Sequence, residues 1–264
     1  MDESALSMNK RYNDKITFYL KTSTFPLAVK MTKEGEIVEQ KYKRPKKDFD
    51  ADMPLCQAIN ICRRNAWTLL LNKNDITCGS AIIYLGFAGA PEAYVQGDIA
   101  FAPYNQTRTA RKTRSEFLPK FPVGEYSGIL ISPLFKAEFT PDSVLIYGNS
   151  AQMMRLIQAA VFKSGEPLLF SAQGGGSCAM EVVGPILDRE VKLVFPGNGA
   201  RIFGGIHDDE IIFGIPNEKL DDMVHWLEET HKGGQRYPVP KYGTYTPKMP
   251  KVYEELLTIL RDER

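Results

Sequence analysis

The chain has 264 residues, of which 43% are hydrophobic and 25% charged, with a formal net charge of +1. A chain of this size can bury enough surface to fold without disulfides or a structural metal. The near-neutral charge gives no general electrostatic argument for nucleic acid or membrane partners. No apolar run approaches the ~20 residues of a membrane span, and the polar N-terminus lacks the apolar core of a secretory signal. We therefore expect a cytoplasmic protein that binds neither nucleic acid nor membrane.

Helices and short apolar strands follow one another irregularly in the first half of the chain. Asp52 is a helix cap, and Pro54 stands in the first turn after it, an arrangement that cap chemistry and proline geometry both favour. The expected elements are a helix at 9–22, a strand at 26–31, a helix at 54–67, a strand at 68–71, an apolar run at 81–87, a helix at 107–118 and a strand at 127–133.

The second half contains the pattern on which the expected fold is based. A strand at 143–147, a helix at 151–162 and a strand at 168–171 read as a βαβ unit, whose crossover should be right-handed. The later elements are a helix that opens at Cys178 and is ended or bent by Gly184-Pro185, strands at 191–195 and 211–215, and helices at 217–230 and 252–260.

Strands and helices are mixed without strict alternation, which favours an α+β fold with a mixed sheet, flanking helices and the central βαβ unit. Residues 1–232 should form one domain. Residues 233–264 should form a C-terminal arm rich in Pro and Tyr, whose helix packs on that domain. The sequence leaves a homo-oligomer open.

Two basic stretches are interpreted as solvated surface. One is the segment 41–47 (KYKRPKK), and the other is the face of the helix at 107–118. The basic side chains of that helix are Arg108, Arg111, Lys112 and Arg114. Such runs are typical of a solvent-exposed surface, and the alternative is that they bind an anionic partner.

Cys178 follows the glycines Gly174, Gly175 and Gly176 and then Ser177. In the first turn of a helix, a thiol faces unpaired backbone N–H groups and the positive end of the dipole, which should lower its pKa. The glycines let the backbone approach a ligand closely. Their Gly-x-Gly-x-x-Ala spacing is only part of a dinucleotide fingerprint. The segment is read as an anion or cofactor site, as a thiolate nucleophile, or as a tight turn with a buried cysteine.

The remaining cysteines are Cys56, Cys62 and Cys78. Cys56 and Cys78 each open a segment, as Cys178 does, and these three could converge as ligands of a soft metal or an iron–sulfur cluster. Free burial is the alternative. Cys62 is on the same helix as Cys56 but would point ~120° away from it, so the two should not share a metal.

Three polar residues are added as cofactor-binding candidates. Gln152 and Arg155 lie on the helix at 151–162, near the carboxyl end of the preceding strand, where open α/β sheets place ligands. Arg201 follows a glycine-rich turn and could reach an anion there, or it could be an ordinary surface arginine. The HDDE segment at 207–210 is interpreted as a polar turn rather than a cation site.

Several segments resemble a prokaryotic family. In chain order they are PLAVKM, PLCQAINICRR, TCGSAIIYLGF, PDSVLIYGNSAQMMRLIQAA, GGGSCAM and GARIFGGIHDDEIIFGIP. Over about 18–227 the chain is similar to domain-of-unknown-function family 169, which occurs in anaerobes and archaea. The resemblance implies a single cytoplasmic domain and no established reaction.

The resemblance also bears on the thiols. It places Cys56, Cys78 and Cys178 at positions where the family often has cysteine. A further family cysteine is replaced here by Pro196 or Gly197, which leaves at most three protein thiolates.

Three functions follow from these observations. The first is a protein that binds a small-molecule cofactor or a soft metal, such as an iron–sulfur centre, through cysteines beside the glycines, in anaerobic or archaeal-type metabolism. The second is an enzyme that uses Cys178 as a thiolate on a small anionic or acyl substrate. The third is a non-catalytic ligand-binding or assembly module. We rank the first ahead of the second because the family-like positions gather three thiols rather than one.

Overall fold

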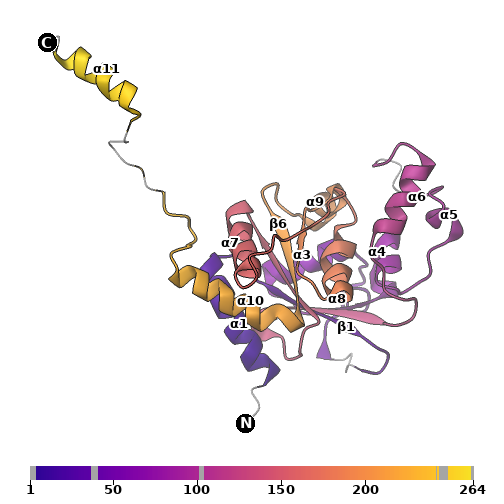
Figure 1. The fold of residues 1–264 in the computed structure, drawn as a ribbon. Helices are drawn as coiled ribbons and strands as arrows, with labels where there is room; N and C mark the ends of the chain where they lie inside the picture. The colour runs from indigo at the N-terminus through magenta and orange to yellow at the C-terminus, as the bar shows by residue number, and fades with distance from the viewer. Residues whose placement is uncertain (1–3, 37–40, 101–103, 242, 244–248, 263–264) are drawn as a thin grey trace.

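The chain folds around one twisted sheet of six strands in the order β2-β3-β1-β4-β6-β5 (Figure 1). The computed structural model describes residues 4–36, 41–100, 104–241, 243 and 249–262. The strands are β1 (Leu27–Thr32), β2 (Leu69–Asn72), β3 (Gly128–Pro133), β4 (Ser143–Gly148), β5 (Lys192–Val194) and β6 (Ile211–Pro216). Helices flank this sheet, so the α+β class is confirmed.

Successive side chains of the central strands point alternately into two separate hydrophobic cores, one on each face of the sheet. In β4, Val144 and Ile146 join one core, whereas Leu145 and Tyr147 join the other. This is the period of two that a strand imposes when both of its faces are covered. The sheet is therefore buried on both sides, and its strands read as continuous apolar runs.

One face of the sheet is covered by α1 (Ala5–Leu20), α7 (Ser150–Val161) and α10 (Asn217–Lys232), which pack against one another (Figure 1). The other face is covered by α3 (Leu55–Asn65), α4 (Gly79–Tyr84), a helix from 177 to 188 and α9 (Asn198–Gly204). The helix from 177 to 188 contains a π-helical stretch (Ala179–Val183) before α8 (Gly184–Asp188). The shorter helices are α2 (Pro45–Phe49), α5 (Glu92–Val95) and α6 (Arg108–Phe117).

The prediction of a mixed sheet with a central βαβ unit is wrong. Every strand pairing in the described part of the chain is antiparallel. The segment expected as the second strand of the unit, 168–171, has no regular structure, and Leu169 is 86% exposed. The two neighbours of β4 in the sheet are β1 and β6, so no edge of β4 is left for a parallel partner. Hydrophobicity alone does not show which strands pair with the two sides of β4.

The chain beyond α10 differs from the body of the protein. The last helix, α11 (Lys251–Asp262), has no buried residue, and Figure 1 draws it apart from the sheet and its helices. The expected packing of this helix on the domain is therefore not seen. Closer to α10 the chain is tied to the body, because the Asn149 side chain donates a hydrogen bond of 2.9 Å to the hydroxyl of Tyr237.

Candidate functional site

Three of the four cysteines meet at one cavity of about 420 Å³, which we call the thiol cavity. Cys56, Cys78 and Cys178 all line it, together with Gly175 and Gly176. The other lining residues are Pro54, Thr77, Ser80, Tyr84, Ala100, Tyr104, Ser177, Gly197, Gly199, Ala200 and Phe203. The cavity thus brings together segments, from Pro54 to Phe203, that are far apart in the chain.

The position of each thiol follows from the start of a helix. Cys56 is in the first turn of α3, Cys78 is the residue that precedes α4, and Cys178 is in the first turn of the helix from 177 to 188. All of these helices cover the same face of the sheet. Side chains at their first turns can therefore converge, although the sequence separates them widely. Cys62 does not line the cavity: its thiol lies in the core, 3.6 Å from the carbonyl oxygen of Ile131.

The glycines at 174–176, which we call the glycine turn, are required by close packing. Gly174 and Gly176 have positive φ angles of +65° and +68°, which side chains rarely adopt. A Cβ on Gly175 would clash with the guanidinium of Arg114. A Cβ on Gly197 would lie 2.5 Å from the Cα of Gly175. The glycine turn is thus pressed between α6 and the start of α9, and one side of it faces the cavity.

The thiols are less acidic than the helix termini suggest. Burial raises the pKa of the Cys178 thiol well above its usual range, and the neighbouring Cys78, Glu181 and Cys56 raise it further. Burial, followed by Glu181 and Cys78, raises the pKa of Cys56 to about 12. The lowered pKa expected for Cys178 is therefore wrong, because loss of hydration outweighs the stabilisation that the helix dipole supplies.

The three thiols are close enough to interact electrostatically. Cys78 raises the pKa of Cys56, and Cys78 and Cys56 both raise the pKa of Cys178. They are not arranged around a single ion. Within the part of the chain that the structure describes, no group of three or more His, Cys, Asp or Glu side chains is placed to hold a metal ion.

The polar candidates on α7 do not reach the cavity. Gln152 completes a capping box with Asn149, and its amide donates a hydrogen bond of 2.9 Å to the carbonyl oxygen of Leu20. Arg155 is fully buried and donates to Thr230 and to the carbonyl oxygen of Leu227. Gln152 thus holds α7 against α1, and Arg155 holds it against α10, on the opposite face of the sheet. Neither of these predicted cofactor-binding side chains lines the thiol cavity.

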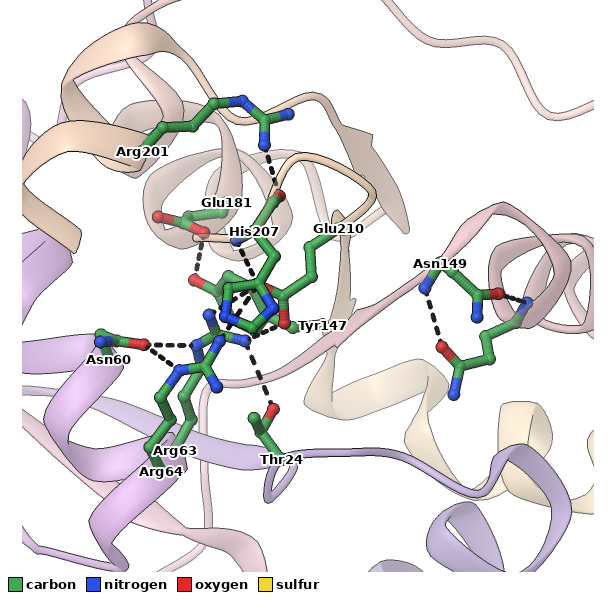
Figure 2. Close-up of polar contacts among 11 residues, drawn as sticks. Thr24, Asn60, Arg63, Arg64, Tyr147, Asn149, Glu181, Arg201, His207 and Glu210 are labelled. Atoms are coloured by element: carbon green, nitrogen blue, oxygen red, sulfur yellow. Dashed lines mark hydrogen bonds and ion pairs between the residues drawn. The ribbon is translucent and has the colours of Figure 1, made fainter. Parts of the chain in front are cut away.

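Arg201, on α9, does not line the cavity either. Its guanidinium donates to the carbonyl oxygen of His207, as Figure 2 shows, and lies 3.9 Å from the carboxylate of Asp208. Arg201 therefore stabilises the turn at 207–210 and does not reach an anion in the cavity. That turn is polar, as the sequence indicated, and Asp208 is fully solvent-exposed.

A buried carboxyl, Glu181, was missed by the sequence analysis. It is in the π-helical stretch one turn after Cys178, is fully buried, and accepts a hydrogen bond of 2.6 Å from the Tyr147 hydroxyl (Figure 2). Its other oxygen has no hydrogen-bond partner in the described part of the chain. Burial raises the pKa of Glu181 to about 7, although the hydrogen bond from Tyr147 and the charge of Arg63 lower it.

Tyr147 connects Glu181 to a second buried polar group. The Arg63 guanidinium lies 4.2 Å from the centre of the Tyr147 ring. It also forms a bidentate ion pair with Glu210, in which its two terminal nitrogens lie 2.5 and 2.8 Å from the carboxylate oxygens (Figure 2). A π-helical stretch, a buried acid and nearby thiols are features that gather at functional sites. The available sequence signal was a lone carboxylate within the apolar run AMEVVGPIL.

The geometry defines an α+β protein with an antiparallel sheet and a thiol-lined cavity. The chain belongs to the DUF169 family, described as "Uncharacterised ArCR", whose model matches residues 15–225. It is 26% identical over 206 residues to "Uncharacterized protein MJ0308" of Methanocaldococcus jannaschii, covering 76% of this chain and 86% of that protein. No solved structure matches the chain significantly. None of the described helices is long and apolar enough to cross a membrane.

Proposed function

We propose that the protein binds a small cofactor in the thiol cavity, in contact with Cys56, Cys78 and Cys178. The single observation that supports this is the convergence of three of the chain's four cysteines on one cavity of about 420 Å³. That volume is within the range of small-molecule sites, which are mostly apolar with a few polar groups. The apolar walls contributed by Tyr84, Ala200 and Phe203 suit an organic molecule.

Co-purification tests this proposal. Native mass spectrometry of the intact protein should show an added mass that denaturation releases. Ala200→Phe should abolish it by filling the cavity, since Ala200 lines the wall. Ile202→Phe is the matched control on the same helix, because Ile202 is 64% exposed and lies outside the lining. An occupant that is equally abundant in both variants would contradict the proposal.

A soft-metal centre is the second candidate, because thiolate ligands select soft metals and iron–sulfur clusters. Since the three thiols are not placed around one ion in the described part of the chain, a metal would have to draw them together. Purification without oxygen, followed by iron and acid-labile sulfide analysis, tests it. Both elements should be lost when Cys56, Cys78 and Cys178 are all replaced by Ala, and kept in Cys62→Ala. Metal-free wild-type protein after anaerobic reconstitution would remove this candidate.

A catalytic thiolate at Cys178 is less well supported. Burial raises the pKa of this thiol, so little thiolate is present near neutral pH. The enzyme hypothesis would regain support only if Cys178 reacted rapidly and selectively with an alkylating agent.

A further inference from the structure

Arg114 is buried behind the thiol cavity, although its helix suggested a wet face. It extends from α6, is 5% exposed, and its guanidinium carbon lies 5.1 Å from the centre of the Tyr104 ring. One guanidinium nitrogen donates 3.3 Å to the carbonyl oxygen of Gln173, at the start of the glycine turn. The guanidinium also occupies the space where a side chain on Gly175 would lie. Because Tyr104 and Gly175 both line the cavity, this positive charge stands directly behind its wall.

A second feature is the charge of the cavity wall itself. None of the residues that line the cavity is Asp, Glu, Lys or Arg within the described ranges. Two helices of more than eight residues, α3 and the helix from 177 to 188, begin at the wall with Cys56 and Cys178. Their N-terminal ends add partial positive charge. The buried acid that interacts with the thiols, Glu181, is kept partly neutral, because burial raises its pKa to about 7.

The wall also supplies neutral hydrogen-bond donors. Thr77 and Ser177 contribute hydroxyl groups to the lining, whereas the hydroxyl of Ser80 is hydrogen-bonded to Tyr84 and Tyr94. The Ser177 oxygen accepts a hydrogen bond of 2.7 Å from the backbone N–H of Gly197, so its own proton can be donated to an occupant. An apolar cavity with a positive charge behind its wall and hydroxyl donors in its lining matches a ligand with an apolar body and an anionic head.

We propose that the cofactor or substrate bound in the thiol cavity carries an oxyanion, a carboxylate or a phosphate, and that Arg114 is the residue that selects it. This inference rests on the proposed function of the cavity as a ligand site. Arg114 acts across the bare Cα of Gly175 as a fixed charge, and the hydroxyls of the wall donate to the oxyanion. A low-dielectric surrounding strengthens such an interaction relative to water.

Three probes that share a phenyl ring test this inference: phenyl phosphate, benzoate and the neutral benzamide, each titrated calorimetrically into the full-length wild-type protein. At least one anion should bind roughly tenfold or more tightly than benzamide, as expected for a hydrogen bond to a charged group. Tighter binding of phenyl phosphate than of benzoate indicates a phosphate ester as the natural occupant. Tighter binding of benzoate indicates a carboxylic acid. Ala200→Phe should abolish binding, which places the probes in the cavity.

Arg114→Gln should reduce anion affinity roughly tenfold while leaving benzamide affinity unchanged. Arg108→Gln is the matched control on α6, because Arg108 is exposed and paired with Asp98. If Arg114→Gln does not fold, the comparison of benzoate with benzamide on the wild-type protein still decides. Benzamide binding as tightly as both anions would overturn the inference and leave the proposed function intact. Failure of all three probes to bind would also overturn it, whereas the co-purification experiment judges the proposed function separately.

Discussion

At the scale of single residues, burial decides the chemistry of the thiol cavity. Cys178 and Glu181 are both buried in an environment that disfavours their charged forms, and the charge of Glu181 further raises the pKa of the Cys178 thiol. The cavity is therefore a site with neutral thiols and a partly neutral acid, until a ligand or a metal changes the electrostatics.

Alkylation provides a direct check on this state. Cys178 and Cys56 should react slowly with iodoacetamide near neutral pH, because only the thiolate attacks and their pKa values are raised. Peptide mapping by mass spectrometry after timed quenching measures each site. The buried Cys62 is the internal reference for a thiol without access to a cavity. Fast labelling confined to Cys178 would show that this thiol is activated and would favour a nucleophilic role.

Glu181 makes the stability of the protein depend on pH. Its folded pKa of about 7 is above the ordinary value of 4.5. Between these values the folded state holds a proton that the unfolded chain releases, so stability is highest below the ordinary pKa and falls as pH rises. One pKa unit corresponds to about 1.4 kcal/mol, so complete ionisation of Glu181 lowers the free energy of unfolding by roughly 3 kcal/mol.

Glu181→Gln should remove this dependence, because glutamine resembles the neutral acid and does not titrate. Denaturant unfolding of both proteins at about pH 5 and about pH 8 should show the wild type losing roughly 2.5 kcal/mol more than the variant. The difference between the two proteins cancels the other titrating groups. Parallel pH profiles would mean that Glu181 is already ionised in the folded protein.

At the scale of the elements, the glycine turn is held by contact with the start of α9. Gly197→Ala should lower the free energy of unfolding by about 1–3 kcal/mol, because its Cβ would lie 2.5 Å from the Cα of Gly175, a backbone atom that cannot rotate away. Gly199→Ala is the control two residues along, where the nearest atom to the new Cβ is 3.9 Å away. Gly199 is inside α9, so this change should be neutral or stabilising by up to ~1 kcal/mol. Thermal or denaturant unfolding that ranks the two variants equally would contradict this account of the packing.

Local patterns predicted most of these elements, and tertiary context explains the rest. The strands at 143–147 and 211–215 were predictable because both faces are buried and the apolar runs are continuous. The apolar segment at 168–171 has the same local signal but lies outside the sheet, in which β4 is already paired on both sides with β1 and β6. Resemblance to a family and the helix starts indicated that three thiols could converge. Their spacing in the sequence could not show that Arg114 would be buried behind them.

At the scale of the whole molecule, the family match ends at residue 225, within α10, and the chain continues through an arm to α11. The helix α11 is amphipathic but exposes its apolar side chains. These are Val252, Tyr253, Leu256, Leu257, Ile259 and Leu260. In the folded chain this helix contributes no buried surface, so it should add nothing to the stability of the sheet and its helices.

Deletion of residues 242–264 should therefore leave the free energy of unfolding unchanged to within ~0.5 kcal/mol. The cut keeps Tyr237, whose hydroxyl accepts from Asn149, and Gln235, which accepts from Gln158, so these two contacts between the arm and the body are preserved. Denaturant unfolding of the full-length and shortened proteins, each at two protein concentrations, measures the effect. A stability loss independent of concentration would mean that α11 docks on its own domain. A loss that grows with protein concentration would mean that it docks on a second copy, since association stabilises by mass action.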